Sequence, residues 1–440
     1  MLPALDGSPA GGPLWLTGGH VVDVRTGTSQ QLNVEVDGGR IGRITAEAPP
    51  PGADQLDLGG RYLLPGLISV HTHLSVVYPF SATDEAESSG VTALRALSRA
   101  QDALLAGVTT IRCVHEQNRA DLLIRTAAEQ GWVAAPRILG AGRAVSTTGG
   151  HGHGMACSYA DGHDGFLAAA RAELGAGADH VKVFITGGIA RQGEGFDGAE
   201  MTPEEMRAVV RAASERGKYV VAHAGAASAI RQALEAGVRS FEHAYQLDDA
   251  TAAEMARRRV FLTPTLCVTR CPEWMADHNF SKWQIERAME VGPAHLASIQ
   301  TAIRNRLPAA GPAGPPGSDG FEGPGITFVA GTDYPPGEPI EDTVVAVREM
   351  EFMAGAGLSP VQALQAGTVN AARLIKLADQ LGAVEPGYVA DLIVADGDPA
   401  ADVSALRSIP FVMQGGRVVR NGLPAHGQPT GPAASAGVPA

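Results

Sequence analysis

The chain has 440 residues, of which 45% are hydrophobic and 18% charged, so it can bury a large core and is neither disordered nor fibrous in composition. The formal net charge of −13 argues against a nucleic-acid partner or an anionic membrane surface, because both require clustered Lys and Arg. No apolar run approaches the roughly 20 residues that span a bilayer, and few cysteines together with an N-terminus lacking a secretory signal predict a cytoplasmic protein.

Short strands at both ends of the chain predict a small β domain. Residues 14–62 show strand-like runs separated by Gly-Gly and Asp-Gly-Gly turns, which are typical of hairpins. A second β-rich piece near the C-terminus follows a helix that opens with Ser359 as cap and Pro360 in its first turn. Because neither fragment can bury a core alone, we expect residues 12–61 and 376–422 to pair into one composite β-sandwich domain.

The middle of the chain, residues 62–375, alternates apolar strand-like runs with Ala-rich amphipathic segments. The strand candidates are YLLPGLISV, GVTTIRCV, PRILGAG, HVKVFIT, KYVVAHA, SFEHAY, VFLTPTL and ITFVAGTD. Alternation of this kind predicts parallel βα units, and these candidates suffice for an α/β fold of the (β/α)₈ TIM-barrel class, whose catalytic groups lie at the C-terminal strand ends. Residues 307–325 form a Pro/Gly-rich loop insertion, and 424–440 are expected to be a disordered tail.

The most informative motif is VHTHL at the end of the first barrel strand. His71 and His73 are two residues apart, so their side chains should point to the same side and can share a metal ion. Other strands end in residues of matching chemistry, namely Lys182, His223, His243 and Asp333. A lysine ammonium would repel metal ions, so Lys182 must be neutral or converted by CO₂ into an anionic carbamate.

These motifs resemble those of the amidohydrolase superfamily of binuclear metal hydrolases, and within it the imidazolonepropionase-like and Xaa-Pro dipeptidase-like group. The resemblance runs from about residue 14 to 421 and rests on LLPGLISVHTHL, GVTTIR, STTGGHGHG, ADHVKVFITGG, VVAHA, SFEHA, GTD and TVNAARLIKLADQLGAVEPGYVADLIVADGDP. It implies two divalent metal ions, with zinc the expected metal. It also implies the ligands: His71, His73 and Asp333 for one ion, His223 and His243 for the second, and N6-carboxylated Lys182 as a bridge beside a hydroxide.

The resemblance also implies catalytic roles. Asp333 would carry the proton of the attacking water to the leaving nitrogen, and His151 in the STTGGHGHG loop would assist the substrate carbonyl. Four further residues near strand ends are candidates for substrate binding: His115, His153, Arg191 and Gly225. We expect His180, one pleat deeper than Lys182, to be a packed core histidine. The remaining histidines are expected to be solvated: His20, His163, His278, His295 and His426.

Three positions depart from the family pattern. The usual Asp before HxH is Ser69, the frequent RDxGG after the second strand reads RCVHE, and the aromatic residue that dipeptidase relatives carry two positions after His223 is Gly225. The last change weakens a dipeptidase assignment, because that aromatic would help to orient the substrate.

The expected function is hydrolysis of an amide C–N bond in a small acyl-amino-acid or peptide-like molecule by a metal-bridging hydroxide. One alternative is hydrolysis of a cyclic amide, urea, carbamate or thiocarbamate. Two others are a mononuclear deaminase, which would lack the strand lysine, and a catalytically inactive scaffold barrel, which would lack metal ligands. Oligomers are common in the resembled group, so we also expect a homo-oligomer.

Overall fold

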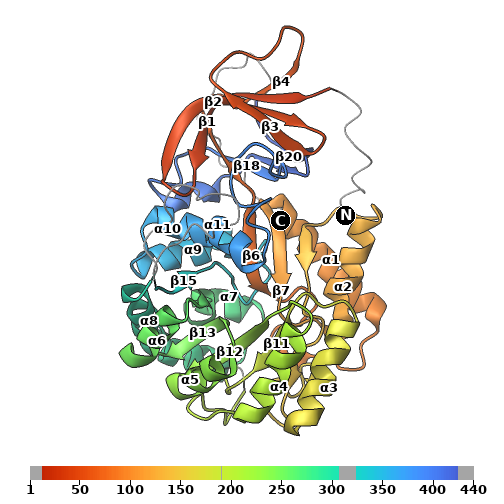
Figure 1. The fold of residues 1–440 in the computed structure, drawn as a ribbon, viewed down its shortest axis with the longest axis vertical. Helices are drawn as coiled ribbons and strands as arrows, with labels where there is room; N and C mark the ends of the chain where they lie inside the picture. Colours follow the sequence, from red (N-terminus) through yellow and green to blue (C-terminus); the bar gives the residue numbers. More distant parts are fainter. Residues whose placement is uncertain (1–11, 190, 307–323, 425–440) are drawn as a thin grey trace.

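The computed structural model describes residues 12–189, 191–306 and 324–424. The predicted Pro/Gly-rich insertion and C-terminal tail therefore lie almost wholly outside the described residues, as does His426. Figure 1 shows a smaller β-rich part built from the first and last strands of the chain, above a larger part in which strands and helices alternate.

The smaller part contains one mixed sheet in the order β20-β19-β18-β5-β1-β2-β3, with β4 beside β1. A turn at Gly38 and Gly39, both with positive φ, joins β2 and β3, as the Asp-Gly-Gly motif predicts. Residues far apart in sequence pair directly, since β5 and β18 are antiparallel with Leu64 opposite Ile393. The strands are β1 (Leu14–Asp23), β2 (Thr28–Asp37), β3 (Arg40–Thr45), β4 (Asp54–Asp57), β5 (Tyr62–Pro65), β18 (Leu392–Ala395), β19 (Phe411–Gln414) and β20 (Arg417–Asn421).

Both chain ends contribute to the apolar core of this sheet. Leu16, Val34 and Ile41 pack in one buried cluster with Leu392 and Phe411. Neither end supplies enough apolar surface by itself, which is why the terminal strands associate. The two-layered sandwich stays a prediction.

The boundary between the two parts differs from the predicted one at residue 62. The apolar run YLLPGLISV predicts a single strand, but it forms two, and β5 pairs with β1 and β18 of the small sheet. The chain passes from the small sheet to the larger part at Gly66. A Cβ atom at this position would lie 2.2 Å from the Thr109 hydroxyl oxygen. Only β6, which starts at Leu67, joins the larger part. Both strands are almost fully buried, so hydrophobicity alone cannot separate them.

Each predicted strand of the middle region is present, and the ladders between them are parallel. They form two sheets, β6-β7-β8 and β10-β9-β11-β12-β13-β14-β15. Backbone hydrogen bonds from Val70 to Ala330 and from Thr332 to His71 connect β6 to the segment after β15. The strands are β6 (Leu67–Thr72), β7 (Val108–Cys113), β8 (Arg137–Leu139), β9 (Val145–Ser146), β10 (Ser158–Tyr159), β11 (Val181–Phe184), β12 (Val220–Ala226), β13 (Ser240–Gln246), β14 (Phe261–Thr263) and β15 (Thr327–Phe328). A short hairpin, β16 (Pro339–Ile340) and β17 (Thr343–Val344), follows.

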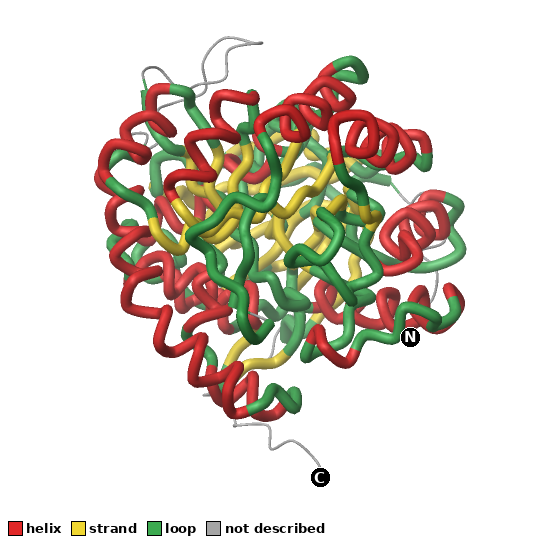
Figure 2. The backbone as a smooth tube through the Cα atoms, turned by 90° about the horizontal axis from the view of Figure 1, so that it is seen from below, coloured by secondary structure: helices red, strands yellow, loops and turns green. Residues whose placement is uncertain are grey.

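Helices surround these strands, as Figure 2 shows. Two of them combine a complete capping box with a proline in the first turn: Thr202 with Glu205 and Ser359 with Gln362. The cap at Ser359 confirms the predicted helix start. The helices are α1 (Ser89–Leu105), α2 (Ala120–Glu129), α3 (Gly162–Gly175), α4 (Pro203–Ser214), α5 (Ala227–Ala236), α6 (Asp249–Arg257), α7 (Pro272–Asp277), α8 (Lys282–Arg304), α9 (Val345–Gly355), α10 (Pro360–Ala366) and α11 (Val369–Leu374).

Helices and strands of the larger part share an extensive apolar core that includes Phe166, Val181, Phe241 and Leu262. Within the described part of the chain, no helix combines the length and the hydropathy needed to cross a lipid bilayer. The fold is mixed α/β with alternating elements, and closure into a complete (β/α)₈ barrel stays a prediction.

Candidate metal centre

His71 and His73, at the end of β6, both contact the carboxylate of Asp333. Their Nε2 atoms lie 2.8 Å and 3.0 Å from the same Asp333 oxygen, Oδ1. The opposite ring nitrogens are also held, with His71 Nδ1 2.5 Å from Glu242 Oε2 and His73 Nδ1 2.9 Å from the His115 carbonyl oxygen. An imidazole anchored through one nitrogen and presenting the other is the usual arrangement of a metal-binding histidine.

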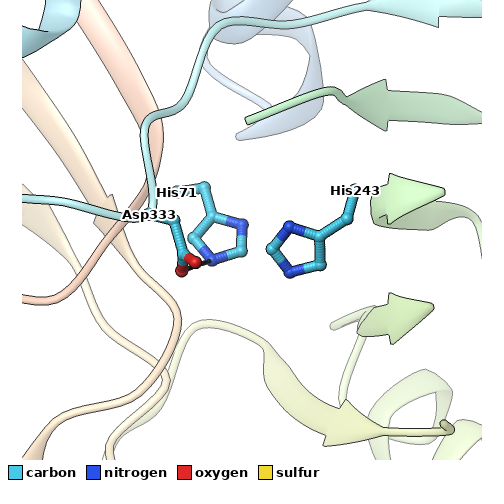
Figure 3. Close-up of side chains that lie close together, drawn as sticks. All are labelled: His71, His243 and Asp333. Carbon is cyan, nitrogen blue, oxygen red and sulfur yellow. Dashed lines mark ion pairs between the residues drawn. The ribbon is translucent and has the colours of Figure 1, made fainter. Parts of the chain in front are cut away.

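His243 approaches the same group from β13. Its ring centroid is 5.1 Å from that of His71, and its Nδ1 is 2.6 Å from the Thr265 hydroxyl. One ligand atom from each of His71, His243 and Asp333 fits within 4.8 Å of the others, and Figure 3 shows the three side chains converging from separate elements. This triad alone offers two imidazole nitrogens and one carboxylate.

His223 and Lys182 extend the cluster. The rings of His223 and His243 are 4.5 Å apart, and His223 Nε2 lies 3.2 Å from the Gly187 carbonyl, which leaves Nδ1 as the ring nitrogen that can face a metal. Lys182 is 1% exposed and lines the same pocket as all five of the other predicted ligands. Burial lowers the pKa of Lys182 to about 8, so a substantial fraction is the neutral amine that reacts with CO₂.

Two histidines of the cluster, His223 and His243, are suited to metal binding in their charge state. Burial holds the pKa of His223 and that of His243 well below the usual value for imidazole. A neutral imidazole is the form that binds a metal ion. Four imidazoles, one carboxylate and one amine that can be made anionic fit two divalent transition-metal ions.

Two ligand positions have unusual backbone conformations. His243 has φ of 67° and Asp333 has φ of 65°, in the left-handed region that residues with a Cβ atom rarely occupy. Such conformations cost free energy and concentrate at functional sites. At His243 the break in the extended strand lets neighbouring Glu242 and His243 both approach His71, although adjacent strand residues normally point to opposite faces.

Glu242 and Arg112 are supporting residues that the sequence did not reveal. Both side chains are fully buried, and Arg112 Nη2 donates to Glu242 Oε1 at 2.9 Å. Although burial acts to raise it, Arg112 and His71 hold the pKa of Glu242 far below the usual value, so the carboxylate is charged. It therefore orients His71 and raises its basicity as a ligand. The position of Glu242 directly before His243 was the available signal, but strand alternation argued against a shared face.

His151 lies in the pocket, as predicted for the Gly-rich loop. Its ring stacks on His223 with centroids 4.3 Å apart, and its Nδ1 is 2.7 Å from Glu194 Oε2. Although burial acts to raise it, hydrogen bonding to His151 lowers the pKa of Glu194. Glu194, which the sequence also did not reveal, thus fixes the orientation of the ring.

The four candidate substrate residues occupy different places. His115 lines the pocket, but its Nε2 contacts the Met155 carbonyl oxygen at 2.7 Å and its Nδ1 accepts from the Ala144 backbone N–H at 3.0 Å. Burial lowers the pKa of His115 to about 3, so it is a neutral residue of the pocket lining, and both of its ring nitrogens already form hydrogen bonds. The other candidates do not line this pocket in the described structure: His153, Arg191 and Gly225.

Each of those three positions has a physical explanation. His153 is exposed, and the Arg191 guanidinium donates to the Gly150 carbonyl and lies 3.6 Å from Glu194. A Cβ atom on Gly225 would lie 2.3 Å from the Cβ of Phe196, so that residue occupies the space beside the glycine.

The expectations for the other histidines are met only in part. His180 is buried, with Nε2 2.9 Å from the Cys113 carbonyl, as expected for a packed core histidine. His163 is exposed. The expectation that His295 is solvated is wrong, because α8 buries it completely with Nε2 3.1 Å from the carbonyl of His243. His20 and His278 are half-buried, stacked on Tyr62 and Trp274 respectively.

Residues 62–420 match the model of the Amidohydrolase family. The chain belongs to this family. The recognition made from the strand-end motifs is therefore confirmed. Among curated proteins, the chain is 24% identical to an ochratoxinase of Aspergillus niger over 68% of its own length, and this match spans 63% of that protein. It is 26% identical to an imidazolonepropionase of Streptomyces avermitilis, over 88% of the chain and 86% of that protein.

Solved structures show the same fold over most of the chain. A Xaa-Pro dipeptidase with methionine bound in its active site superposes with a TM-score of 0.79 at 27% identity, covering 93% of this chain and 100% of the other. A prolidase complexed with N-methylphosphonate-L-proline gives a TM-score of 0.81 at 26% identity, with the same coverage of both chains.

Proposed function

We propose that this chain is a binuclear metal-dependent hydrolase that cleaves an amide C–N bond in a small molecule. The observation that carries the proposal is the convergence of six potential ligands, from five strand ends, on one pocket. We place this pocket at the C-terminal mouth of a closed (β/α)₈ barrel, where enzymes of that fold have their active sites.

In the proposed centre, His71, His73 and Asp333 would hold one divalent ion, and His223 and His243 would hold a second. Lys182, if carboxylated, would supply a ligand shared by both. We propose zinc as the metal. When bound, two such ions would supply a nucleophilic water at neutral pH and polarise the substrate carbonyl. The ionised Glu242, the Thr265 hydroxyl and the His115 carbonyl hold the ligand rings in place.

Asp333 is the proposed proton carrier. Burial acts to raise the pKa of Asp333. The electrostatic attraction of His71 and the hydrogen bonds with His71 and His73 nevertheless hold this pKa well below the usual range. Asp333 is therefore a carboxylate at neutral pH, able to take a proton from water and deliver it to the leaving nitrogen. The Tyr78 hydroxyl helps to fix the position of Asp333, because it donates a hydrogen bond to the backbone carbonyl oxygen of Asp333 at 2.9 Å.

His151 is the proposed partner of the substrate carbonyl. A protonated ring held by Glu194 through Nδ1–H would direct Nε2–H into the pocket, where it can stabilise negative charge on the carbonyl oxygen. The amine or amino acid that leaves then departs with the proton from Asp333.

Metal analysis combined with a substrate panel tests the proposal. We expect about two transition-metal ions per chain, and faster hydrolysis of acyclic amides than of lactams, ureas, carbamates and thiocarbamates of similar size. If lactams or ureas are hydrolysed faster, the proposed substrate changes to one of those compounds, and the proposed metal centre is retained. Purified protein without stoichiometric metal would overturn the proposal, and if it also hydrolyses none of the panel, a scaffold role is favoured.

A further inference from the structure

The pocket that contains the candidate ligand cluster is lined by two chemically different groups of residues. The histidines, Lys182 and Asp333 form its polar floor. Most of the other lining residues are apolar or aromatic, and the empty space of the pocket, including its opening to solvent, is about 670 Å³. The wall, as named below, consists of Phe80, Ile189, Val268, Met275, Phe280 and Tyr334.

The wall belongs to an aromatic cluster separate from the barrel core. Tyr78 contacts the rings of Phe80 at 5.2 Å and Tyr334 at 5.5 Å, while Trp274 stacks on Tyr334 at 3.9 Å. Phe280 stacks on Tyr78 at 6.3 Å. The residues come from four segments, after β6, after β11, around α7 and after β15, so the wall is braced from several directions.

Among the described residues of the pocket, the apolar wall includes no Lys or Arg that could pair with a substrate carboxylate, and His151 lies with the ligand cluster on the polar floor. Lys182 is the sole Lys or Arg among the described lining residues, and it lies within the ligand cluster. The nearby arginines are directed elsewhere: Arg191 donates to Gly150, Arg99 lies over the Tyr78 ring, and Arg287 lies over Phe196. A carboxylate placed against the wall would lose its hydration without gaining a partner, which is strongly unfavourable.

We infer that the amide cleaved here carries an uncharged aromatic or similarly bulky apolar group against the wall, and no carboxylate on that part. This inference rests on the proposed function and narrows it away from acyl-amino acids and dipeptides. Hydrolysis of such an amide adds OH from water to the acyl carbon and H to the nitrogen, so a carboxylic acid and an amine form without any other reactant.

Hydroxamates test the wall independently of turnover, because the hydroxamate group binds the metal and its substituent samples the pocket. We would titrate metal-loaded protein calorimetrically with acetohydroxamate, benzohydroxamate, 4-isopropylbenzohydroxamate and 4-carboxybenzohydroxamate. The last two have para groups of similar shape but different charge. The two uncharged aromatic compounds should bind about tenfold or more tighter than acetohydroxamate, and the carboxylate about tenfold or more weaker than its isopropyl match. Equal or tighter binding of the carboxylate compound would overturn the inference.

A charge placed on the wall provides a second test. Phe280 is half-buried, so Phe280→Arg can be accommodated, and Phe280→Leu is the matched apolar control. The arginine should improve the affinity for the carboxylate relative to the isopropyl compound by about tenfold, whereas the leucine should leave that ratio unchanged. If the ratio is the same in both variants, the para group does not face the wall and the inference is wrong.

Turnover separates this inference from the proposed reaction. We would measure hydrolysis of benzanilide, acetanilide and 4-carboxybenzanilide by the metal-loaded protein. If the hydroxamate order holds but none of the anilides or other amides is cleaved, the proposed reaction fails while the wall assignment stands. Hydrolysis that favours the carboxylate compound would preserve the reaction and reject the wall assignment.

Discussion

The two ends of the central strands carry ionisable groups in opposite arrangements. At the C-terminal ends, His71, His243 and Asp333 are packed within a few ångströms of one another, with both histidines buried and Asp333 half-buried. At the N-terminal ends, a groove is lined by Arg125, Arg137, Asp179, Lys218 and Lys376. There Asp179 pairs with Arg125 at 2.6 Å and Lys218 at 3.2 Å, and these side chains are between 21% and 38% exposed.

This difference is the one expected between the proposed functional cluster and a structural one. In the N-terminal groove, Asp179 neutralises two neighbouring cations and remains partly hydrated, so the arrangement is stable by itself and is worth little more than a surface ion pair. The C-terminal cluster concentrates imidazoles and an amine around a single strained aspartate. Such a group is costly to bury unless a bound ion compensates for it.

Asp333 and Asp179 offer the sharpest test of the comparison. Asp333→Asn should lower kcat by about 10³-fold on the best substrate, because the proton carrier is lost. Asp179→Asn, at the other end of the strands, should change kcat by less than about twofold, although it leaves two cations unpaired. Steady-state kinetics, with the metal content measured on the same samples, compares the two variants. Similar losses in both variants would show that the two ends are not functionally distinct.

Lysines at the two ends provide a second matched pair. Lys182→Ala should remove most of the activity and reduce the metal content below two ions per chain, because the proposed bridge is absent. Short carboxylic acids added in excess should restore part of both. Lys218→Ala should keep its metal and activity. Full activity of Lys182→Ala without rescue would contradict the bridging role.

Glu242→Gln tests whether the residues that hold the candidate ligands in place affect metal affinity as well. The change removes the charge that faces both Arg112 and His71, so we expect metal affinity to fall about 10–100-fold. It should also cost about 3 kcal/mol of unfolding free energy, since Arg112 is left buried without its anion. Competitive metal titration and urea denaturation measure the two effects. Unchanged metal affinity would reduce Glu242 to a purely structural role.

The smallest expected effect is a pH dependence at Glu349. Its carboxylate accepts hydrogen bonds from the backbone N–H groups of Leu266 and Cys267, and burial raises its pKa from 4.5 to about 7. Between about pH 4.5 and 7 the folded state therefore binds more protons than the unfolded state, so the contribution of this group to stability falls as pH rises.

Glu349→Gln should remove this slope from the unfolding free energy measured by denaturation across that range. Glu129→Gln, at an exposed position in the N-terminal groove, should leave it as in the unmodified protein. An unaltered slope in Glu349→Gln would mean that Glu349 is ionised in the folded state throughout the range.

Local patterns in the sequence were sufficient to locate the barrel strands and the polar residues at their ends, because strand periodicity and chain alternation are properties of neighbouring residues. The His71 and His73 pair, the cap at Ser359 and the family itself could be recognised in this way. The division of one apolar run into β5 and β6 could not, since both strands are equally buried.

Only the tertiary structure decided which distant groups meet. Glu242 is 171 residues from His71, and the positive φ of His243 that lets both reach that ring leaves no trace in hydropathy. The burial of His295 and the aromatic wall around Phe280 likewise depend on segments folded over the strand ends. Sequence determines the chemistry available at each strand end, whereas side-chain orientation and long-range packing determine which of those groups share a pocket.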